Sequence, residues 1–160
     1  NGNLVYGWKK NTPPITQSQE KELINRGLMS EQEARFQLKE ADTGKEVLIQ
    51  ASSVAWNEYR KKWILIGEQS FGESSFLGEI WYAEAPSPTG PWEKAKKIVT
   101  HNNYSFYNPI HHVHFDEDNG RVIYFEATYT ATFTDSEPTP YYDYNQIMYR
   151  LELDNPALFP

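Results

Sequence analysis

The sequence predicts an all-β fold, and three observations support that prediction. Aromatic residues make up 15% of the 160-residue chain, and Tyr, Phe and Trp favour strands over helices. The 10 Pro and 9 Gly are scattered along the chain, as expected where short strands alternate with turns. A pattern of strands also repeats with an offset of 59 residues, as described below. The length is that of one ordinary domain.

Composition restricts the classes of partner. The formal net charge of −7 argues against a nucleic acid or an anionic membrane as the main partner, because phosphate binding requires a basic patch. The chain has no cysteine, so disulfides and thiolate metal sites are excluded. It also has no apolar run of about 18 residues, so no membrane span is predicted.

Residues 1–45 are expected to be the end of a preceding unit followed by a helical insertion. A short strand is predicted over residues 4–8, and because the chain begins on it, we expect a piece of a longer protein. Two helices are then predicted, one from the N-cap candidate Ser18 to Gly27 and one from the capping box Ser30–Glu33 through Ala34, Phe36 and Leu38. The resulting helical hairpin is read as a structural insertion, with a lid over a site as the alternative.

The next segment, residues 46–100, predicts four strands. Three of them cover residues 46–55, 62–69 and 78–85, and the fourth is a short strand over residues 97–100. Residues 56–61 connect the first two strands, and residues 71–77, rich in Gly and Ser, form a loop. The Pro-rich stretch 86–92 is a rigid turn.

The stretch from Phe106 to Thr128 combines a polar cluster with a β-hairpin. Residues 116–120 end in Asn-Gly, which supplies the positive φ angles of a tight turn, and residues 122–125 form an apolar strand. Four polar side chains immediately precede the turn: Asn108, His111, His112 and His114.

The two segments repeat each other. Val54-x-Trp56 with residues 63–66 matches Val113-x-Phe115 with residues 122–125, and residues 79–82 match residues 146–149. A unit of about 60 residues with three or four antiparallel strands is typical of a β-propeller blade. We therefore predict a propeller fragment of about two and a half blades, with blades at 46–100 and 105–155. An open sandwich that repeats is the alternative.

The motifs SSVAWNEYRKKWILIG at residues 52–67 and GEIWYAEAPSPTGPW at residues 78–92, followed by the histidine-bearing start of the next blade, resemble the five-bladed propeller glycoside hydrolases of the family-43 type. The resemblance covers about residues 46–155. It implies that residues 50–53 and 108–112 face a central axis, and that the rest of the ring comes from the remaining blades of a parent chain. It also implies a substrate pocket lined by Ser53, Tyr107, Asn108, His111 and His112.

The same resemblance implies catalytic carboxylates, because glycoside hydrolysis requires an acid and a base or nucleophile. No carboxylate occurs at Gln50-Ala51-Ser52, where the general acid would be expected. The remaining candidates are Glu79 and Glu126, either of which could act as an acid if burial raises its pKa. The alternative is that each is an exposed glutamate at the end of a strand.

The histidines and aromatic residues each have two interpretations. The resemblance places His112, or its neighbour His111, near a bound calcium ion or water, whereas hydrogen-bonded structural histidines are the alternative. A zinc site is not favoured, because His112 and His114 are predicted to share one strand face without a carboxylate nearby. Trp63 and Trp81 are expected in the core, and a glycan surface is sought in the aromatic residues of 141–145 together with Tyr104, Phe106 and Tyr107.

The sequence therefore predicts a carbohydrate-active propeller, secreted or periplasmic, that binds a glycan in a central pocket and resembles a hydrolase. No cofactor is expected apart from a possible calcium ion at the axis. Two alternatives stay open: a non-catalytic propeller that recognises a glycan or a protein, and a purely structural module of a larger protein.

Overall fold

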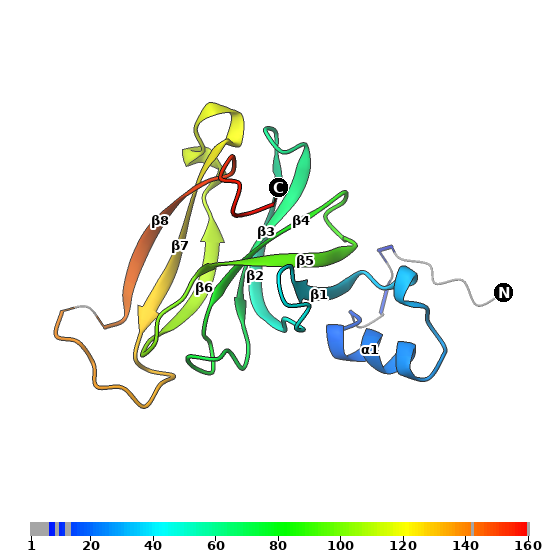
Figure 1. The fold of residues 1–160 in the computed structure, drawn as a ribbon, viewed down its shortest axis with the longest axis horizontal. Helices are drawn as coiled ribbons and strands as arrows, with labels where there is room; N and C mark the ends of the chain where they lie inside the picture. The colour runs from blue at the N-terminus through cyan, green and yellow to red at the C-terminus, as the bar shows by residue number, and fades with distance from the viewer. Residues whose placement is uncertain (1–6, 9, 12–13, 142, 160) are drawn as a thin grey trace.

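The part of the protein that the structure describes is mostly β, with one α-helix and two sheets (Figure 1). The computed structural model describes residues 7–8, 10–11, 14–141 and 143–159. Five strands form the first sheet in the order β1-β5-β4-β3-β2, and three strands form the second in the order β6-β7-β8. The prediction of a mainly β protein with a small helical part is confirmed. No helix in the described part of the chain is both long and apolar enough to cross a membrane.

The first sheet is an antiparallel meander with one added strand. Strands β2 to β5 pair antiparallel in chain order, and β1 joins the edge of β5 in parallel. The predicted strand at residues 62–69 is confirmed as β3. The strand predicted to begin at residue 46 begins at residue 49, as β2, and the strand predicted to begin at residue 97 begins at residue 92, as β5. The bounds are Phe36–Glu40 for β1, Ile49–Asn57 for β2, Lys62–Gln69 for β3, Ile80–Ala85 for β4 and Trp92–Val99 for β5.

The second sheet is a three-stranded antiparallel meander of β6 (Ser105–His111), β7 (Val122–Thr130) and β8 (Asn145–Glu152). The turn before β7 has positive φ angles at Asn119 (57°) and Gly120 (86°), as the Asn-Gly pair predicted. The prediction that His112 and His114 lie on a strand is wrong. His112 precedes a 3-10 turn, η2 (Val113–Phe115), and His114 lies inside it.

The sequence repeat corresponds to a repeated meander, β2-β3-β4 and β6-β7-β8. Its second and third strands match, because residues 63–66 lie in β3 and residues 122–125 in β7, and residues 80–82 lie in β4 and residues 147–149 in β8. Its first strands differ, since Trp56 lies in β2 whereas Phe115 lies in η2. The second sheet ends at β8, while the first continues from β4 into β5 and β1.

The main core lies between the two sheets, where β3 and β4 pack against β6 and β7. Its members are buried apolar side chains from both sheets, including Ile64, Ile66, Ile80, Tyr82, Phe106, Ile123, Phe125 and Ala127. A second cluster covers the opposite face of the first sheet and contains Leu38, Leu65, Trp81 and Trp92. Trp63 packs against this second cluster, so the expectation that Trp63 and Trp81 belong to the core is confirmed.

The N-terminal segment contains one helix instead of the predicted hairpin of two. Helix α1 (Gln17–Asn25) is capped by Thr16, whose side chain accepts the Gln19 N–H, so the predicted cap at Ser18 is wrong. The second capping box does form at Ser30 and Glu33, but it starts only a 3-10 turn, η1 (Glu31–Glu33). The following residues form β1, because Ala34, Phe36 and Leu38 alternate with the two-residue period of a strand. The strand predicted over residues 4–8 falls mostly outside the described residues.

The buried carboxylate of Glu20 bonds α1 to the first sheet, beside the bond from the Gln37 amide of β1 to the Gln17 carbonyl oxygen. Glu20 is 1% exposed and accepts the backbone N–H groups of Arg35 at 3.0 Å and Phe36 at 2.9 Å, together with the Gln37 amide at 3.2 Å. These donors lie at the start of β1, where no neighbouring strand is available to accept them. The helix therefore protects the edge of β1 through its side chain.

We expect Glu20→Ala to lower the free energy of unfolding by about 2–3 kcal/mol, because it leaves buried N–H groups without an acceptor. The control is Glu22→Ala on the same helix, whose exposed side chain pairs with Arg26 across 3.3 Å; it should change stability by no more than about 0.5 kcal/mol. Urea denaturation of both variants measures the difference. Equal small effects would contradict a role for Glu20 in attaching the helix.

Candidate functional site

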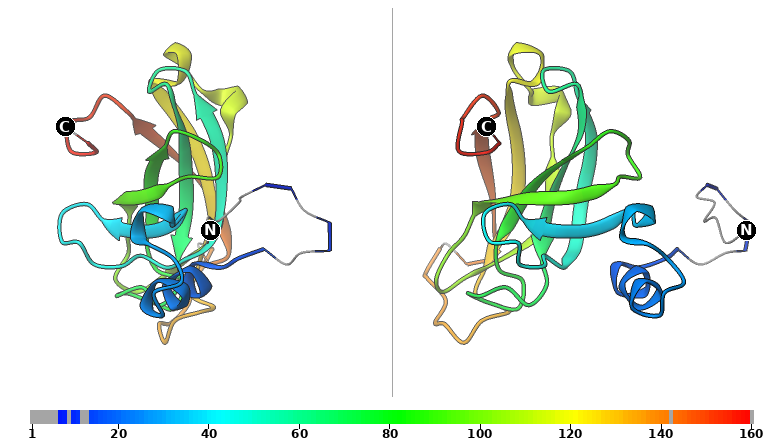
Figure 2. Two further views of the ribbon diagram at one scale, coloured as in Figure 1. Left: turned by 90° about the vertical axis from the view of Figure 1, so that its right-hand side faces the viewer. Right: turned by 45° about the vertical axis from the view of Figure 1, so that its right-hand side comes forward.

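Two long loops lie side by side at one end of the sheets, which we call the loop face. One loop, residues 70–79, connects β3 to β4, and the other, residues 131–144, connects β7 to β8. Figures 1 and 2 show both at the lower end of the molecule, opposite the turns that contain residues 57–62 and 112–121. Loops held by a rigid pair of sheets are the usual place for binding residues.

The β3–β4 loop is anchored to the second sheet. The carbonyl oxygen of Leu77 accepts the Phe106 N–H at 2.9 Å, and the Ser105 hydroxyl donates to the Ser75 hydroxyl at 2.7 Å. Leu77 itself is buried. The start of β6 therefore fixes the position of a loop that belongs to the other sheet.

The β7–β8 loop is closed at its base by Asp143. One oxygen of this carboxylate accepts the Ala131 N–H at 2.7 Å and the Thr130 hydroxyl at 3.3 Å. Further along the loop, the buried Tyr104 donates its hydroxyl to Thr139 at 2.6 Å. Tyr104 and Phe106, both considered for a glycan surface, are thus buried supports of the loop face.

Between the two loops is a groove of about 480 Å³, which we call the loop groove. Five of the side chains that line it carry hydroxyls, two are aromatic and one is a carboxylate: Ser74, Ser75, Thr132, Thr134, Ser136, Phe76, Phe133 and Asp135. Each hydroxyl can both donate and accept a hydrogen bond. Four of the five hydroxyls, those of Ser74, Ser75, Thr132 and Thr134, already share a hydrogen bond with another protein group, so each offers a ligand its remaining hydrogen-bonding capacity. The lining also offers apolar ring surface and contains no Lys or Arg side chain.

Two sequence candidates contact this groove from behind. The Tyr107 ring packs against the Phe133 ring, with centroids 5.6 Å apart. The Glu79 carboxylate accepts the Ser74 hydroxyl at 3.3 Å, and it is 1% exposed. Glu79 is therefore not the exposed glutamate of the alternative interpretation. A Cβ on Gly72 would come within 2.2 Å of its other oxygen, so only glycine fits above this carboxylate.

A second buried carboxylate, Glu68, lies between the sheets. One oxygen accepts the Asn108 N–H at 3.0 Å, while the other is buried and has no hydrogen-bond partner. Burial raises the pKa of Glu68 to about 7, although the N–H bond from Asn108 lowers it. Asn108 has a φ of 50° at a bulge in β6, so this bond holds an unusual backbone conformation in place.

His111 and His112 are adjacent in sequence but have different surroundings, whereas the rings of His112 and His114 lie 5.6 Å apart. His111 is buried on the core side, where its Nε2 lies 2.9 Å from the Asp116 carboxylate. Its backbone N–H donates to the Ser53 hydroxyl at 2.8 Å, which joins β6 to β2. His112 instead lies 3.3 Å from Glu126, which is half-exposed.

Both histidines thus have a carboxylate neighbour, contrary to the expectation from sequence. Among the described residues, no group of three or more His, Asp or Glu side chains is arranged to hold a metal ion. His112 precedes η2 and pairs with Glu126 on β7, and neither residue lines the loop groove. The candidates Ser53, Asn108 and His111 connect the two sheets, and of the sequence candidates only Tyr107 and Glu79 support the groove.

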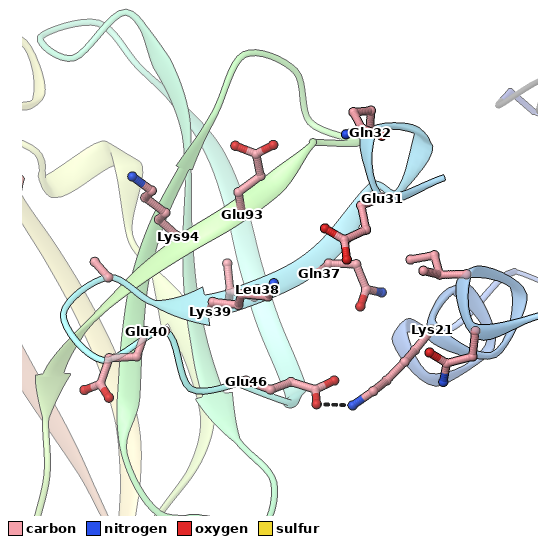
Figure 3. Close-up of a pocket in the computed structure, with 14 residues that line it drawn as sticks. Lys21, Glu31, Gln32, Gln37, Leu38, Lys39, Glu40, Glu46, Glu93 and Lys94 are labelled. Atoms are coloured by element: carbon pink, nitrogen blue, oxygen red, sulfur yellow. Dashed lines mark hydrogen bonds and ion pairs between the residues drawn. The ribbon is translucent and has the colours of Figure 1, made fainter. Parts of the chain in front are cut away.

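A cleft of about 500 Å³ lies between α1 and the exposed surface of β1 and β5 (Figure 3). Its lining mixes amines and carboxylates, and Lys21 forms an ion pair with Glu46 across it. Because both signs of charge alternate along its walls, the cleft has no field that selects one kind of ion. The loop groove is lined mainly by neutral hydroxyl side chains, with one carboxylate, and we therefore regard it as the candidate site.

The groove was missed in the sequence because its two walls are 58 residues apart, from Ser74 to Thr132. Two features of the sequence could have indicated the groove. The loop that begins at Ala131 is eight residues longer than the corresponding loop of the first repeat, and it is rich in Thr and Ser. No protein-family model matches the chain, and no curated protein matches it.

Glu68 predicts a specific dependence of stability on pH. The folded protein keeps the proton of Glu68 up to a pKa of about 7, whereas the unfolded chain releases it near 4.5. Stability from this group is thus complete below pH 4.5 and is lost as the pH rises to about 7. We expect Glu68→Gln, which retains an acceptor for Asn108, to remove this loss and raise the melting temperature at pH 8 by roughly 5 °C.

Thermal unfolding of both proteins from pH 4 to pH 8 measures the effect. The control is Glu73→Gln, because Glu73 is an exposed loop carboxylate paired with Lys45. Melting curves of Glu68→Gln and the unaltered protein that stay parallel over this range would show that Glu68 does not carry a raised pKa.

Proposed function

We propose that this protein binds a neutral glycan in the loop groove. The observation that supports this most strongly is the lining itself: five hydroxyl side chains and two phenylalanines around about 480 Å³. This volume is within the range of small-ligand sites. A sugar ring matches the lining because its edge carries hydroxyls and its face carries C–H groups that can pack on an aromatic ring.

Charge supports a neutral ligand over an ionic one. The only formal charge in the lining is Asp135, which is exposed, and the chain has a net charge of −7. An anionic ligand would meet no cation in the groove and would be repelled by the protein as a whole. A cation would have a single exposed carboxylate as partner, which gives little binding in water.

The same proposal includes a propeller arrangement, in which the two sheets are successive blades of the five-bladed type. The repeated meander and the face-to-face packing of β3 and β4 on β6 and β7 support it. The inner strands β2 and β6 both begin at the loop face, at which propeller proteins of the resembled family carry their substrate pocket. A glycan in the loop groove would then lie beside that pocket.

Hydrolysis is the second candidate function, and one observation favours it. Glu68 has a pKa of about 7, which suits a general acid near neutral pH. However, the Glu68 side chain is 0% exposed, and Glu79 is closed in below Gly72. A general acid must come within hydrogen-bond reach of the leaving oxygen, so binding without turnover agrees better with the geometry.

The test begins with a screen of the protein on a glycan array, followed by calorimetric titration with the best neutral oligosaccharide. We expect Phe133→Ala to weaken this binding about tenfold, because it removes one of the two rings that line the groove. The control is Phe115→Ala, which removes an exposed ring at the opposite end of the sheets and should leave affinity unchanged.

Two results would count against the proposal. Absence of binding to any neutral glycan would reject glycan recognition, and equal loss in both variants would place the ligand outside the groove. Release of reducing sugar, abolished in Glu68→Gln, would instead favour the hydrolytic function.

A further inference from the structure

Two phenylalanine rings project from the β3–β4 loop into solvent. Phe71 is 71% exposed and Phe76 is 48% exposed, and their rings meet edge to face with centroids 5.0 Å apart. We call this pair the aromatic ridge. Large apolar side chains that stand together in water are a frequent mark of a binding surface.

The ridge is held rigidly rather than exposed by a loose loop. The Phe71 N–H donates to the Phe76 carbonyl oxygen at 2.7 Å, which closes the loop on itself. Phe71 and Glu79, at the two ends of the loop, have φ angles of 57° and 54°. Bulky residues rarely adopt this left-handed conformation, and such strain is concentrated at functional positions.

A depression lies on each side of the ridge. Phe76 borders the loop groove, and Phe71 borders a second cleft of about 510 Å³ between α1 and the ends of β2 and β3, which we call the helix cleft. Asn25 from α1 and Gln69 and Ser70 from the end of β3 line the helix cleft. In two views, α1 lies towards the same end of the molecule as the loops (Figures 1 and 2).

The charged groups of the helix cleft neutralise one another. Lys21 pairs with Glu46 (Figure 3), and Glu22 pairs with Arg26 across 3.3 Å. The remaining polar side chains of the lining are the amides of Asn25 and Gln69 and the hydroxyls of Ser18 and Ser70. Each charged side chain that lines the helix cleft thus has a partner of opposite charge, so the cleft has no unpaired charge that would attract an ion. The two depressions have similar volumes, about 510 and 480 Å³.

We propose that the ligand is an extended glycan chain that runs from the loop groove across the aromatic ridge into the helix cleft. This inference rests on the proposed glycan binding and adds its length and path. Sugar rings that cross the ridge would cover Phe71 and Phe76 with their apolar faces. The rings beyond would lie in the helix cleft and hydrogen-bond to the exposed Asn25 amide and to the NH2 group of Gln69, whose oxygen already accepts the Trp81 N–H, so affinity grows with chain length until both depressions are filled.

The test measures affinity for oligosaccharides of one to eight units, prepared from a polysaccharide that the unaltered protein binds in a panel of β-glucan, mannan, xylan and starch. Phe71→Gly removes the ring furthest from the loop groove and also relieves the positive φ angle. We therefore expect its melting temperature to stay within about 3 °C of the unaltered protein. The control is Phe115→Gly.

We expect Phe71→Gly to weaken binding of the longest oligosaccharides about tenfold and to leave binding of the shortest within about twofold. Asn25 lies at the far side of the helix cleft, so Asn25→Ala should reduce only the increase in affinity that the last sugar units of the longest oligosaccharides contribute. Affinity that does not rise with chain length, or a Phe71→Gly loss that is equal for short and long ligands, would overturn the extended path. The glycan proposal itself would fail separately, if the unaltered protein bound no polysaccharide in the panel.

Discussion

The fold depends on the contact between two sheets whose facing surfaces are apolar in the middle and hydrogen-bonded near the end strands β2 and β6. Ile64, Ile66, Phe106 and Phe125 exclude water from the middle of this contact, and burial of such side chains is the main favourable contribution to folding. Alongside, the Ser53 hydroxyl accepts the His111 N–H, and the Asn57 amide donates to the Gly120 carbonyl oxygen at 2.8 Å. These directional bonds define the register of one sheet on the other, which apolar packing alone does not specify.

The loop face follows from this contact. Because the β3–β4 loop is bonded to the start of β6, its position is fixed only when the second sheet is in place. The β7–β8 loop is closed independently by Asp143. The two walls of the loop groove therefore belong to different sheets, and each is held by hydrogen bonds at its base. Such preorganisation lowers the entropic cost of binding a ligand between them.

Much of the fold could be predicted from the sequence, whereas the site could not. Strand β3 and the turn before β7 were predicted well, since a continuous apolar run and an Asn-Gly pair are local signals. The error at Ala34, Phe36 and Leu38 arose because a capping box suggested a helix, although the spacing of these residues is that of a strand. The histidine cluster is visible in the sequence, but the sequence does not show that Asp116 is the partner of His111 or that Glu126 is the partner of His112. The groove forms only where two loops come together, and no local sequence pattern predicts how two distant loops are placed relative to each other.

One difference between the two repeats affects how the protein behaves at high concentration. Strand β4 is covered on its outer side by β5, but β8 has no partner strand on its outer side within the described part of the chain. An open strand edge presents backbone groups that can pair with another chain. Arg150 and Glu152, charged and exposed on β8, make such pairing less favourable. Strand β8 is therefore a sheet edge whose own charged side chains oppose pairing with another chain, on the opposite side of the second sheet from β6.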